Sequence, residues 1–287
     1  MIPAAFAYSR PTSLDEAVAL LSAHAGEAKV LAGGQSLLPL MKLRLARPER
    51  VVDIGRLAEL RGIRPLPDGR VAVGALTTYR AMLDSGAVTR YGLLRDALPR
   101  IADVQVRNVG TIGGAIAHAD PASDMPACLL ALEAEIVARS ARGARTIPAT
   151  DFFRGSFETA LEPDEILTEV ILPAGREDAG SAYTSLEQLA SGYAIVGVAA
   201  VVLVAAGRVA GARVAVTGVS DVAYRAVAVE TALVGSSAGT ADLAAAAAHV
   251  TDGRTVNSDI HADAAYRAEM ARVFVRRALA AALARVA

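Results

Sequence analysis

The stretch KVLAGGQSLLPLMKLRLARPERVVDIGRL, residues 29–57, places the pair Gly33 and Gly34 between an apolar run and a leucine-rich segment. The runs at residues 28–31 and 49–54 are typical of short strands, so the glycine pair follows a strand. Two interpretations of the pair are open at this point. It is either a plain turn between a strand and a helix, or a backbone cradle for a negatively charged group.

The segment RPTSLDEAVALLSAHAG, upstream of this stretch, predicts a capped helix. Ser13 is placed as the N-cap with Glu16 three residues later, the pattern of a capping box. Apolar residues then recur at helical spacing until Gly26 ends the segment. Together with the strands that follow, the pattern predicts a β-α-β arrangement near the N-terminus.

The middle of the chain changes pattern. Apolar runs on both sides of the turn at residues 67–69 predict a hairpin, and Thr77 or Thr78 is placed as the cap of a helix. A second helix is expected around residues 93–101, and an amphipathic helix from about Met125 to Leu132.

Residues 161–173 predict a turn followed by an alternating strand, and the polar stretch AGREDAG marks a domain boundary. Beyond it, strands are expected at residues 194–204 and 208–220, with a further candidate at 224–230. Three alanine-rich helical segments close the chain. Strands followed by helices indicate an α+β domain.

Composition narrows the function classes. The 287 residues are 53% hydrophobic and carry a formal net charge of −1, which indicates a globular protein without the basic surface of a nucleic-acid binder. Cys128 is the single cysteine, so the chain cannot form an internal disulfide or hold an iron–sulfur cluster. The four histidines lack metal-site spacing, and no metal site is expected.

Location is predicted from two further features. The N-terminus lacks the charged and apolar regions of a secretory signal. The longest apolar run, residues 194–206, is well short of the roughly 20 residues that span a bilayer. We therefore expect a cytoplasmic protein without a transmembrane segment.

A second glycine pair lies in TIGGAIAHADPASD, residues 111–124, and is followed by Asp120 and Asp124. Neither pair matches the dinucleotide fingerprint G-x-G-x-x-G or a P-loop. Each pair alone is a weak signal. Two pairs together, the second followed by acids, favour a dinucleotide held between two lobes.

Four segments carry a resemblance to a known family: LAGGQSLLPLMKLRLARPERVVDI, VRNVGTIGGAIAHADPASDMPA, LEPDEILTEVILP and HADAAYRAEMARVFVRRALAAAL. They resemble the flavin subunits of the carbon monoxide dehydrogenase and xanthine dehydrogenase (molybdenum hydroxylase) family over nearly the whole chain. The implied fold is α+β: a two-subdomain FAD-binding unit of the vanillyl-alcohol-oxidase (PCMH) type, then a carbon monoxide dehydrogenase flavoprotein-type C-terminal α+β domain. The implied domains are 1–58, 59–176 and 177–287.

The resemblance also implies FAD as the cofactor. The first glycine loop would wrap the pyrophosphate, and the second would approach pyrophosphate and ribityl from the other lobe. Ser123 and Asp124 match positions that bind the hydroxyl-bearing part of FAD, and Tyr193 matches an aromatic near the flavin ring. The implied cofactor-binding residues are Ala32, Gly33, Gly34, Gln35, Ser36, Leu37, Thr111, Ile112, Gly113, Gly114, His118, Ser123 and Asp124.

Alternatives stay open at several of these positions. Asp124 is also a candidate cap for the helix that follows it. Tyr193 is also compatible with a half-buried strand residue, and His118 with a histidine that has only a structural role. Many relatives carry histidine where Gln35 stands, and often a cation within the segment YTSLEQLASGYAIVGVAA. Here that segment contains no lysine or arginine, and the next cation along the chain is Arg208. The group that would stabilise negative charge on the reduced flavin is therefore open.

The implied function is that of an FAD-carrying electron-transfer subunit. Its partners would be a molybdenum-cofactor large subunit and a 2Fe-2S small subunit, in a dimer of heterotrimers, with attachment to a membrane surface only through those partners. No residue pattern in the chain supplies hydroxylation chemistry itself, so the flavin would carry the redox step. The alternatives are a stand-alone FAD-dependent oxidoreductase and a flavin-free assembly or binding protein. The substrate and the final electron acceptor are open.

Overall fold

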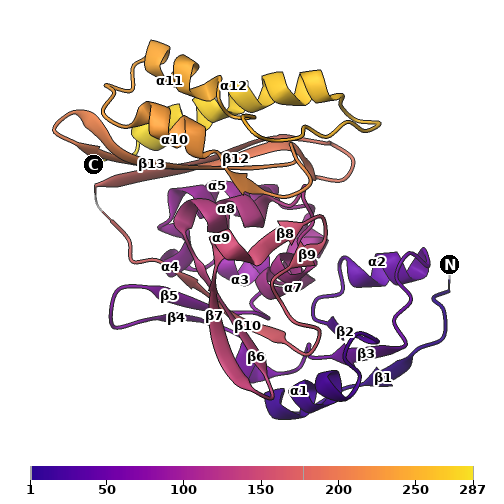
Figure 1. Cartoon of the computed structure of the whole chain (residues 1–287). Coiled ribbons are helices and arrows are strands. Elements are labelled where there is room, and N and C mark those ends of the chain that lie inside the picture. The colour runs from indigo at the N-terminus through magenta and orange to yellow at the C-terminus, as the bar shows by residue number, and fades with distance from the viewer. Residues whose placement is uncertain (1, 177, 287) are drawn as a thin grey trace.

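The computed structural model describes residues 2–176 and 178–286. Figure 1 shows three units: a small N-terminal lobe, a central sheet with helices above it, and a C-terminal sheet covered by the last three helices. The expected boundary between residues 176 and 177 falls at residue 177, which lies outside the described residues. The expected α+β class is confirmed.

The N-terminal lobe is a parallel three-stranded sheet in the order β1-β3-β2, with one helix on the β1–β2 connection and one on the β2–β3 connection. Its elements are β1 (Ala7–Ser9), α1 (Leu14–Ala23), β2 (Ala28–Leu31), α2 (Leu37–Lys42) and β3 (Arg50–Asp53). The Ser13 side chain accepts the N–H of Glu16, as expected. The Glu16 carboxylate, however, accepts from Thr12 and not from Ser13. The lobe therefore has the predicted β-α-β pattern.

The central unit is an antiparallel sheet in the order β4-β5-β10-β6-β7. The predicted hairpin is formed by β4 and β5, and Thr78 is the N-cap of α3. The elements are η1 (Ala58–Leu60), β4 (Ile63–Pro65), β5 (Val71–Gly74), α3 (Tyr79–Leu83), α4 (Gly86–Thr89), α5 (Gly92–Ala97), η2 (Leu98–Arg100), α6 (Val104–Val109), α7 (Ile112–His118), α8 (Asp124–Leu132), β6 (Glu135–Ser140), β7 (Gly143–Pro148), α9 (Ala149–Phe152), β8 (Phe153–Gly155), β9 (Glu158–Thr159) and β10 (Ile166–Leu172).

The C-terminal unit is an antiparallel sheet in the order β11-β12-β13-β14. It consists of β11 (Ala179–Glu187), β12 (Ala194–Ala205), β13 (Arg208–Thr217), β14 (Tyr224–Arg225), α10 (Val227–Leu233), α11 (Thr240–Ala247) and α12 (Ala264–Leu283). The expectation of a strand over residues 224–230 is wrong beyond Arg225, because α10 begins at Val227. The three closing helices are present as predicted.

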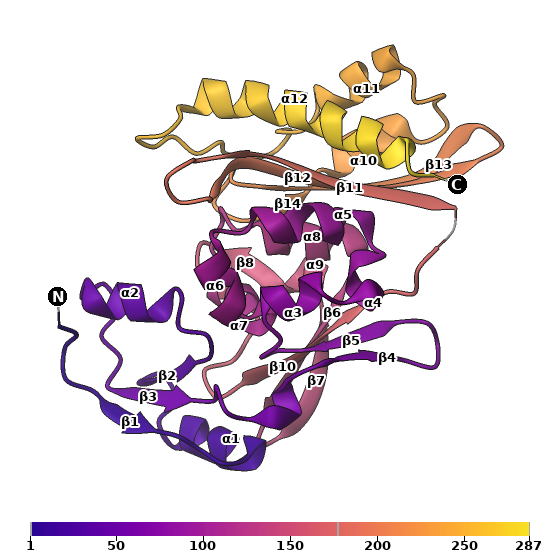
Figure 2. The same cartoon turned by 180° about the vertical axis from the view of Figure 1, so that it is seen from behind.

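The helix α8 differs from its prediction as an amphipathic helix. Every residue from Asp124 to Leu132 is buried, because α8 contacts β12 and β13 on one side and α5 and α9 elsewhere. Figure 2 shows α5 and α8 between the C-terminal sheet and the central sheet. A helix covered on all sides does not keep a polar face.

The apolar run in β12 is explained by burial on both faces. Ala199 and Val201 pack with the central unit, whereas Val198 and Ala200 pack with α12 and its neighbours. Alternate residues of a strand point to opposite faces, so both sets must be apolar. Within the described residues, no helix is both long enough and apolar enough to cross a bilayer.

Close packing of α12 on β11 depends on Gly180. A Cβ at this position would lie 1.9 Å from the carbonyl oxygen of Ala282. We expect Gly180→Ala to lower the free energy of unfolding by about 1–3 kcal/mol, because helix and strand must separate.

Urea unfolding measures this loss, with Gly211→Ala on β13 as the matched control. A Cβ at Gly211 meets only Leu203 Cδ1 at 3.6 Å, an ordinary contact. Equal stability of the two variants would contradict the prediction.

Candidate cofactor site

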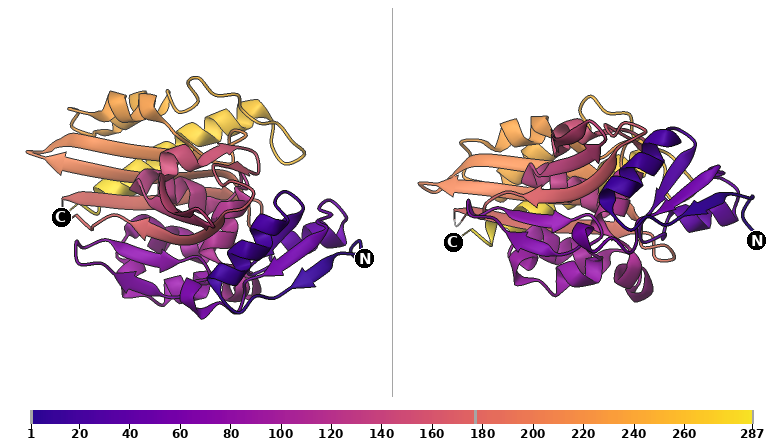
Figure 3. Two further views of the ribbon diagram at one scale, coloured as in Figure 1. Left: turned by 60° about the horizontal axis from the view of Figure 1, so that its bottom comes forward. Right: turned by 90° about the horizontal axis from the view of Figure 1, so that it is seen from below.

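The first glycine loop lies at the carboxyl end of β2, between that strand and α2 (Figure 3). Gly34 has a φ of 71°, in the left-handed region that favours glycine. In the described part of the chain, the backbone N–H groups of Gly33, Gly34, Gln35 and Ser36 donate to no protein acceptor. Successive N–H groups without acceptors form a nest that suits an anion.

The Ser36 hydroxyl adds to this set of donors. Ser36 is the N-cap of α2, yet its side chain makes no capping hydrogen bond. The Gln35 side chain turns back and donates from Nε2 to the Gly33 carbonyl oxygen at 3.1 Å. The backbone and Ser36 therefore carry the binding potential of the loop, while Gln35 supports its shape.

Gly33 is where the N-terminal lobe meets the central unit. A Cβ on Gly33 would lie 2.2 Å from the carbonyl oxygen of Val109 and 3.1 Å from the Cα of Gly110. These residues directly precede the second glycine segment. The close approach explains the need for glycine at residue 33 and places the two glycine segments side by side.

The second glycine pair is built differently from the first. Gly113 and Gly114 lie in the first turn of α7, and their N–H groups are already used. Gly113 donates to the Ala75 carbonyl oxygen at 2.9 Å, and Gly114 donates to Thr111 Oγ1 at 3.2 Å. Ile112 likewise donates to the Thr77 carbonyl oxygen at 3.1 Å. These three N–H groups are therefore not free to form an anion nest.

Packing explains the second glycine pair instead. A Cβ on Gly113 would lie 2.5 Å from the Cβ of Ala75, so glycine lets α7 approach the end of β5. A Cβ on Gly114 would lie 2.9 Å from Thr111 Oγ1, the hydroxyl that caps α7. The wider prediction, that Thr111, Ile112, Gly113 and Gly114 contact FAD, stays a prediction.

A cavity of about 200 Å³ lies where the two segments meet. Three predicted residues line it: Ala32, Gly33 and Thr111. Sequence reasoning missed the other lining residues: Gly55, Arg61, Leu76, Thr78, Asn108 and Val109. Asn108 and Val109 lie in a segment that carries the family resemblance, and Thr78 is expected only as a helix cap. No pattern in the sequence relates these residues to the others, and the fold brings them together.

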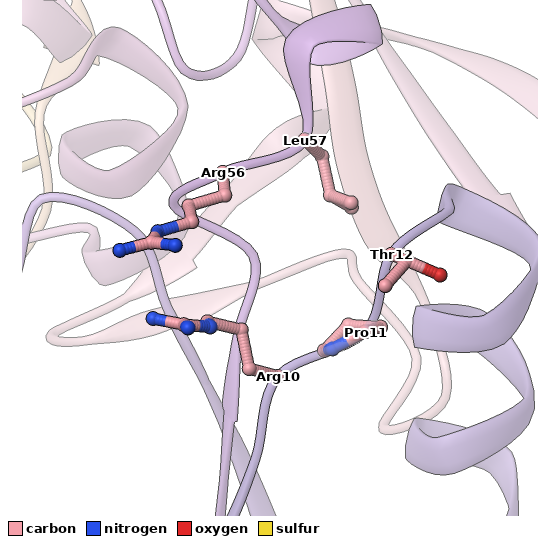
Figure 4. Close-up of a pocket in the computed structure, with 5 residues that line it drawn as sticks. All are labelled: Arg10, Pro11, Thr12, Arg56 and Leu57. Carbon is pink, nitrogen blue, oxygen red and sulfur yellow. The ribbon is translucent and has the colours of Figure 1, made fainter.

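A second cavity, of about 290 Å³, lies beyond the carboxyl ends of β1 and β3 (Figure 4). Arg10 and Arg56 line it together with Pro11, Thr12 and Leu57. It includes none of the predicted cofactor-binding residues.

Tyr193 joins the C-terminal unit to the first loop. It is 42% exposed, and partial burial, followed by the Asp120 carboxylate, raises the pKa of its phenol, while the Ser36 hydroxyl lowers it. Three segments distant in sequence therefore meet around this phenol. This geometry favours the prediction of a site aromatic over that of a plain strand residue, since Tyr193 lies in the turn before β12.

His118 lies at the C-terminal end of α7 and packs against Phe157, with ring centroids 5.0 Å apart. Burial lowers the pKa of its imidazole, and the Asp120 carboxylate partly opposes this effect. The neutral imidazole is thus the favoured form near pH 7. Its predicted contact with FAD stays a prediction.

Asp124 differs from its predicted role as a helix cap. Ser123, and not Asp124, is the N-cap of α8. The Asp124 carboxylate is only 4% exposed and accepts a hydrogen bond from the Tyr183 hydroxyl of β11. Burial raises the pKa of Asp124 to about 7. In this structure Asp124 links α8 to the C-terminal sheet, and a contact with FAD hydroxyls stays a prediction.

The Arg100 side chain brings a positive charge to the segment 183–200, which contains no cation of its own. Arg100, at the end of η2, pairs with Glu187 of β11 at 2.8 Å, and Ser185 Oγ lies 2.8 Å from the same carboxylate oxygen. Arg100 precedes Glu187 by 87 residues, so no local sequence pattern predicts this ion pair. The Arg100 charge also lowers the pKa of Asp124, although burial outweighs it.

Comparison with known proteins gives a consistent assignment. The family model described as the FAD binding domain in molybdopterin dehydrogenase matches residues 4–175, and that of the CO dehydrogenase flavoprotein C-terminal domain matches residues 181–282. The carbon monoxide dehydrogenase medium chain of Hydrogenophaga pseudoflava is 42% identical, with all of both chains covered. The 6-hydroxypseudooxynicotine dehydrogenase complex subunit alpha of Paenarthrobacter nicotinovorans is 38% identical over 99% of this chain and 96% of that one.

Solved structures agree with these matches. A chain of carbon monoxide dehydrogenase from Hydrogenophaga pseudoflava superimposes with a TM-score of 0.96 and 44% identity, and covers 100% of both chains. The predicted two-part fold is therefore confirmed at the level of the whole chain.

Proposed function

We propose a function from the premise that this chain belongs to the family of FAD-binding molybdopterin dehydrogenase flavoproteins, and is an FAD-binding oxidoreductase subunit. In the proposal it is the electron-transfer subunit of a molybdenum hydroxylase. It receives electrons from an iron–sulfur partner and passes them to an external acceptor.

The free amides of residues 33–36 are the observation that carries the proposal. An FAD pyrophosphate bears about two negative charges, and N–H donors in a low-dielectric cleft bind such a group without a metal ion. The donors present therefore fit the pyrophosphate of FAD.

The other residues would complete this site. Ser36 would donate its hydroxyl to the cofactor, and Tyr193 would lie beside the flavin and limit access of water. His118 and Ser123, on the opposite segment, would contact the cofactor from the central unit. When bound, FAD supplies the chemistry of accepting two electrons and two protons and passing them on.

Partner subunits follow from what the chain itself holds. Cys128 is fully buried, and one cysteine cannot ligate a 2Fe-2S cluster. Among residues 2–176 and 178–286, no group of three or more His, Cys, Asp or Glu side chains is placed to hold a metal ion. The molybdenum cofactor and the clusters would therefore lie on a large and a small partner subunit, assembled as a dimer of heterotrimers.

The substrate is not assigned by this proposal. Two relatives are named for different substrates, carbon monoxide and 6-hydroxypseudooxynicotine. In such an assembly the choice of substrate would lie with the molybdenum subunit.

Expression of the chain alone tests cofactor binding. We expect a yellow protein with one FAD per chain and no turnover of small reductants by itself. A colourless protein that stays empty after incubation with FAD would support the flavin-free alternative. Rapid turnover by the isolated chain would support the stand-alone enzyme.

Coexpression with the genes beside this one tests the assembly. We expect co-purification with two further chains and flavin reduction by substrate only in the complete complex. Identical size-exclusion profiles with and without those chains would exclude the complex.

A further inference from the structure

Arg267 is a charged residue buried within the C-terminal unit, only 4% exposed, on the first turns of α12. Its Nη1 donates to the carbonyl oxygens of Ile195 at 2.8 Å and Gly218 at 2.7 Å. Its Nη2 donates to the Asp259 carboxylate. A buried guanidinium is costly unless it is paired and hydrogen-bonded, so these contacts fix its position.

The two carbonyl acceptors belong to adjacent strand ends next to the candidate site. Ile195 lies in β12, two residues after Tyr193, and Gly218 directly follows β13. Gly218 has a φ of 80°, and a Cβ there would lie 2.5 Å from the Ala194 carbonyl oxygen. The guanidinium therefore bridges two segments that already lie in close contact.

The same strand ends hold the segment between α7 and α8. The Gly218 N–H donates to the Pro121 carbonyl oxygen at 2.8 Å, and the Ala194 N–H donates to the Ala122 carbonyl oxygen at 3.2 Å. The Thr217 hydroxyl lies 2.7 Å from the Pro121 carbonyl oxygen and 2.8 Å from that of Ser123. The Arg267 contacts therefore fall on Gly218 itself, and on Ile195 next to Ala194, the residues whose N–H groups bond to residues 121 and 122.

We infer that Arg267 is a positioning residue for the cofactor site. By holding Ile195 and Gly218 together, it sets the place of Tyr193 and of the segment from Asp120 to Asp124. It acts through these residues and does not itself touch the cofactor. The inference rests on the proposed function in one respect, that this segment and Tyr193 face FAD.

A purely structural role would serve only to attach α12 to the sheet. That attachment already has an apolar basis, because Phe274, Val275 and Leu279 of α12 are buried in the core of the C-terminal unit. Among the described residues, the hydrogen bonds of the Arg267 guanidinium go instead to the strand ends and to Asp259. The two roles therefore predict different consequences of losing the guanidinium.

Arg267→Met tests the inference, with Arg272→Met as the control on the same helix. Arg272 is half exposed, and among the residues that the structure describes its ion-pair partner is Glu269. In full-length flavin-free protein, we expect Arg267→Met to raise amide exchange at Ala194, Gly218 and residues 118–124. We expect the dissociation constant for FAD to rise about tenfold, because the residues that support the site would be held less firmly. Arg272→Met should change neither quantity.

Arg267→Lys keeps the test decisive if Arg267→Met does not fold. A lysine retains the charge but lacks the planar fork that reaches two carbonyls and a carboxylate, so we expect an intermediate FAD affinity. Unchanged exchange at residues 118–124 and an unchanged affinity in the folded variants would overturn the inference. Weaker FAD binding without faster exchange at Ala194 and Gly218 would also overturn it.

The same measurements separate this inference from the proposed function. If the wild-type chain bound no FAD, the proposed function would fail. The exchange comparison between Arg267→Met and Arg272→Met would still decide whether the arginine positions residues 118–124.

Discussion

Gly33→Val is expected to abolish retention of FAD, with an affinity lower by on the order of a hundredfold or more. The new Cβ would lie 2.2 Å from the Val109 carbonyl oxygen, which belongs to the backbone and cannot rotate away. The loop would have to shift, and its free N–H groups would no longer converge on one anion. Flavin absorbance per chain after gel filtration, and titration of the empty protein with FAD, measure the loss.

Gly86→Val is the matched control, because a Cβ at Gly86 meets nothing within 4 Å. Gly113→Val provides a contrast, since its Cβ would strike Ala75 inside the packed central unit. We expect Gly113→Val to lower the melting temperature more than Gly33→Val does. Full flavin content in folded Gly33→Val would refute the amide nest.

The contrast between the two glycine pairs shows what the sequence could predict. The sequence of the first pair is compatible with both a turn and a cradle. The structure favours the cradle because, within the described residues, no protein acceptor takes the N–H groups of residues 33–36. The second pair looked alike in sequence. The acceptor of the Gly113 N–H, the Ala75 carbonyl oxygen, lies more than 30 residues upstream, whereas Gly114 donates to Thr111 Oγ1 within the same segment. The local pattern therefore does not reveal that the Gly113 N–H is already used.

Long-range contacts explain the other differences. The pattern of α8 indicated an amphipathic helix, because the sequence does not reveal that a second sheet covers its outer face. Arg100 and Arg267 were not singled out for the site, since their partners Glu187 and Gly218 lie on distant segments. The caps at Ser13 and Thr78 and the hairpin of β4 and β5 are local features, and the sequence predicts them correctly.

Asp124 supplies the second large effect, on stability as a function of pH. Burial raises its pKa in the folded chain to about 7, against an ordinary value of 3.8. The folded state therefore favours the protonated carboxyl. This contribution to stability is fully present below about pH 3.8, falls as pH rises, and is lost above about pH 7.

Asp124→Asn removes this titration but keeps an oxygen that accepts the Tyr183 hydroxyl. Relative to wild type, the variant should gain stability between pH 4 and pH 7, by on the order of 4 kcal/mol, and then level off. Urea unfolding of the flavin-free chain at a series of pH values measures the difference. A constant difference across this range would contradict the assignment of the raised pKa to Asp124.

Asp164→Asn serves as a control of opposite sign. The hydrogen bond from Arg142 is the first cause that lowers the pKa of Asp164, so its contribution is lost as pH falls. Relative to wild type, this variant should become less destabilised toward low pH.

Tyr183→Phe separates the role of the hydrogen bond from that of burial. The hydroxyl of Tyr183 is the donor to the buried Asp124 carboxylate, and losing a donor to a buried acceptor costs about 1–3 kcal/mol. The cost should be larger at pH 8, where the carboxylate is charged, than at pH 5, where it is mostly protonated. Equal costs at the two pH values would mean that Asp124 does not change charge between them. Because Asp124 links α8 to β11, this measurement also reports how firmly the C-terminal sheet is held against the candidate cofactor site.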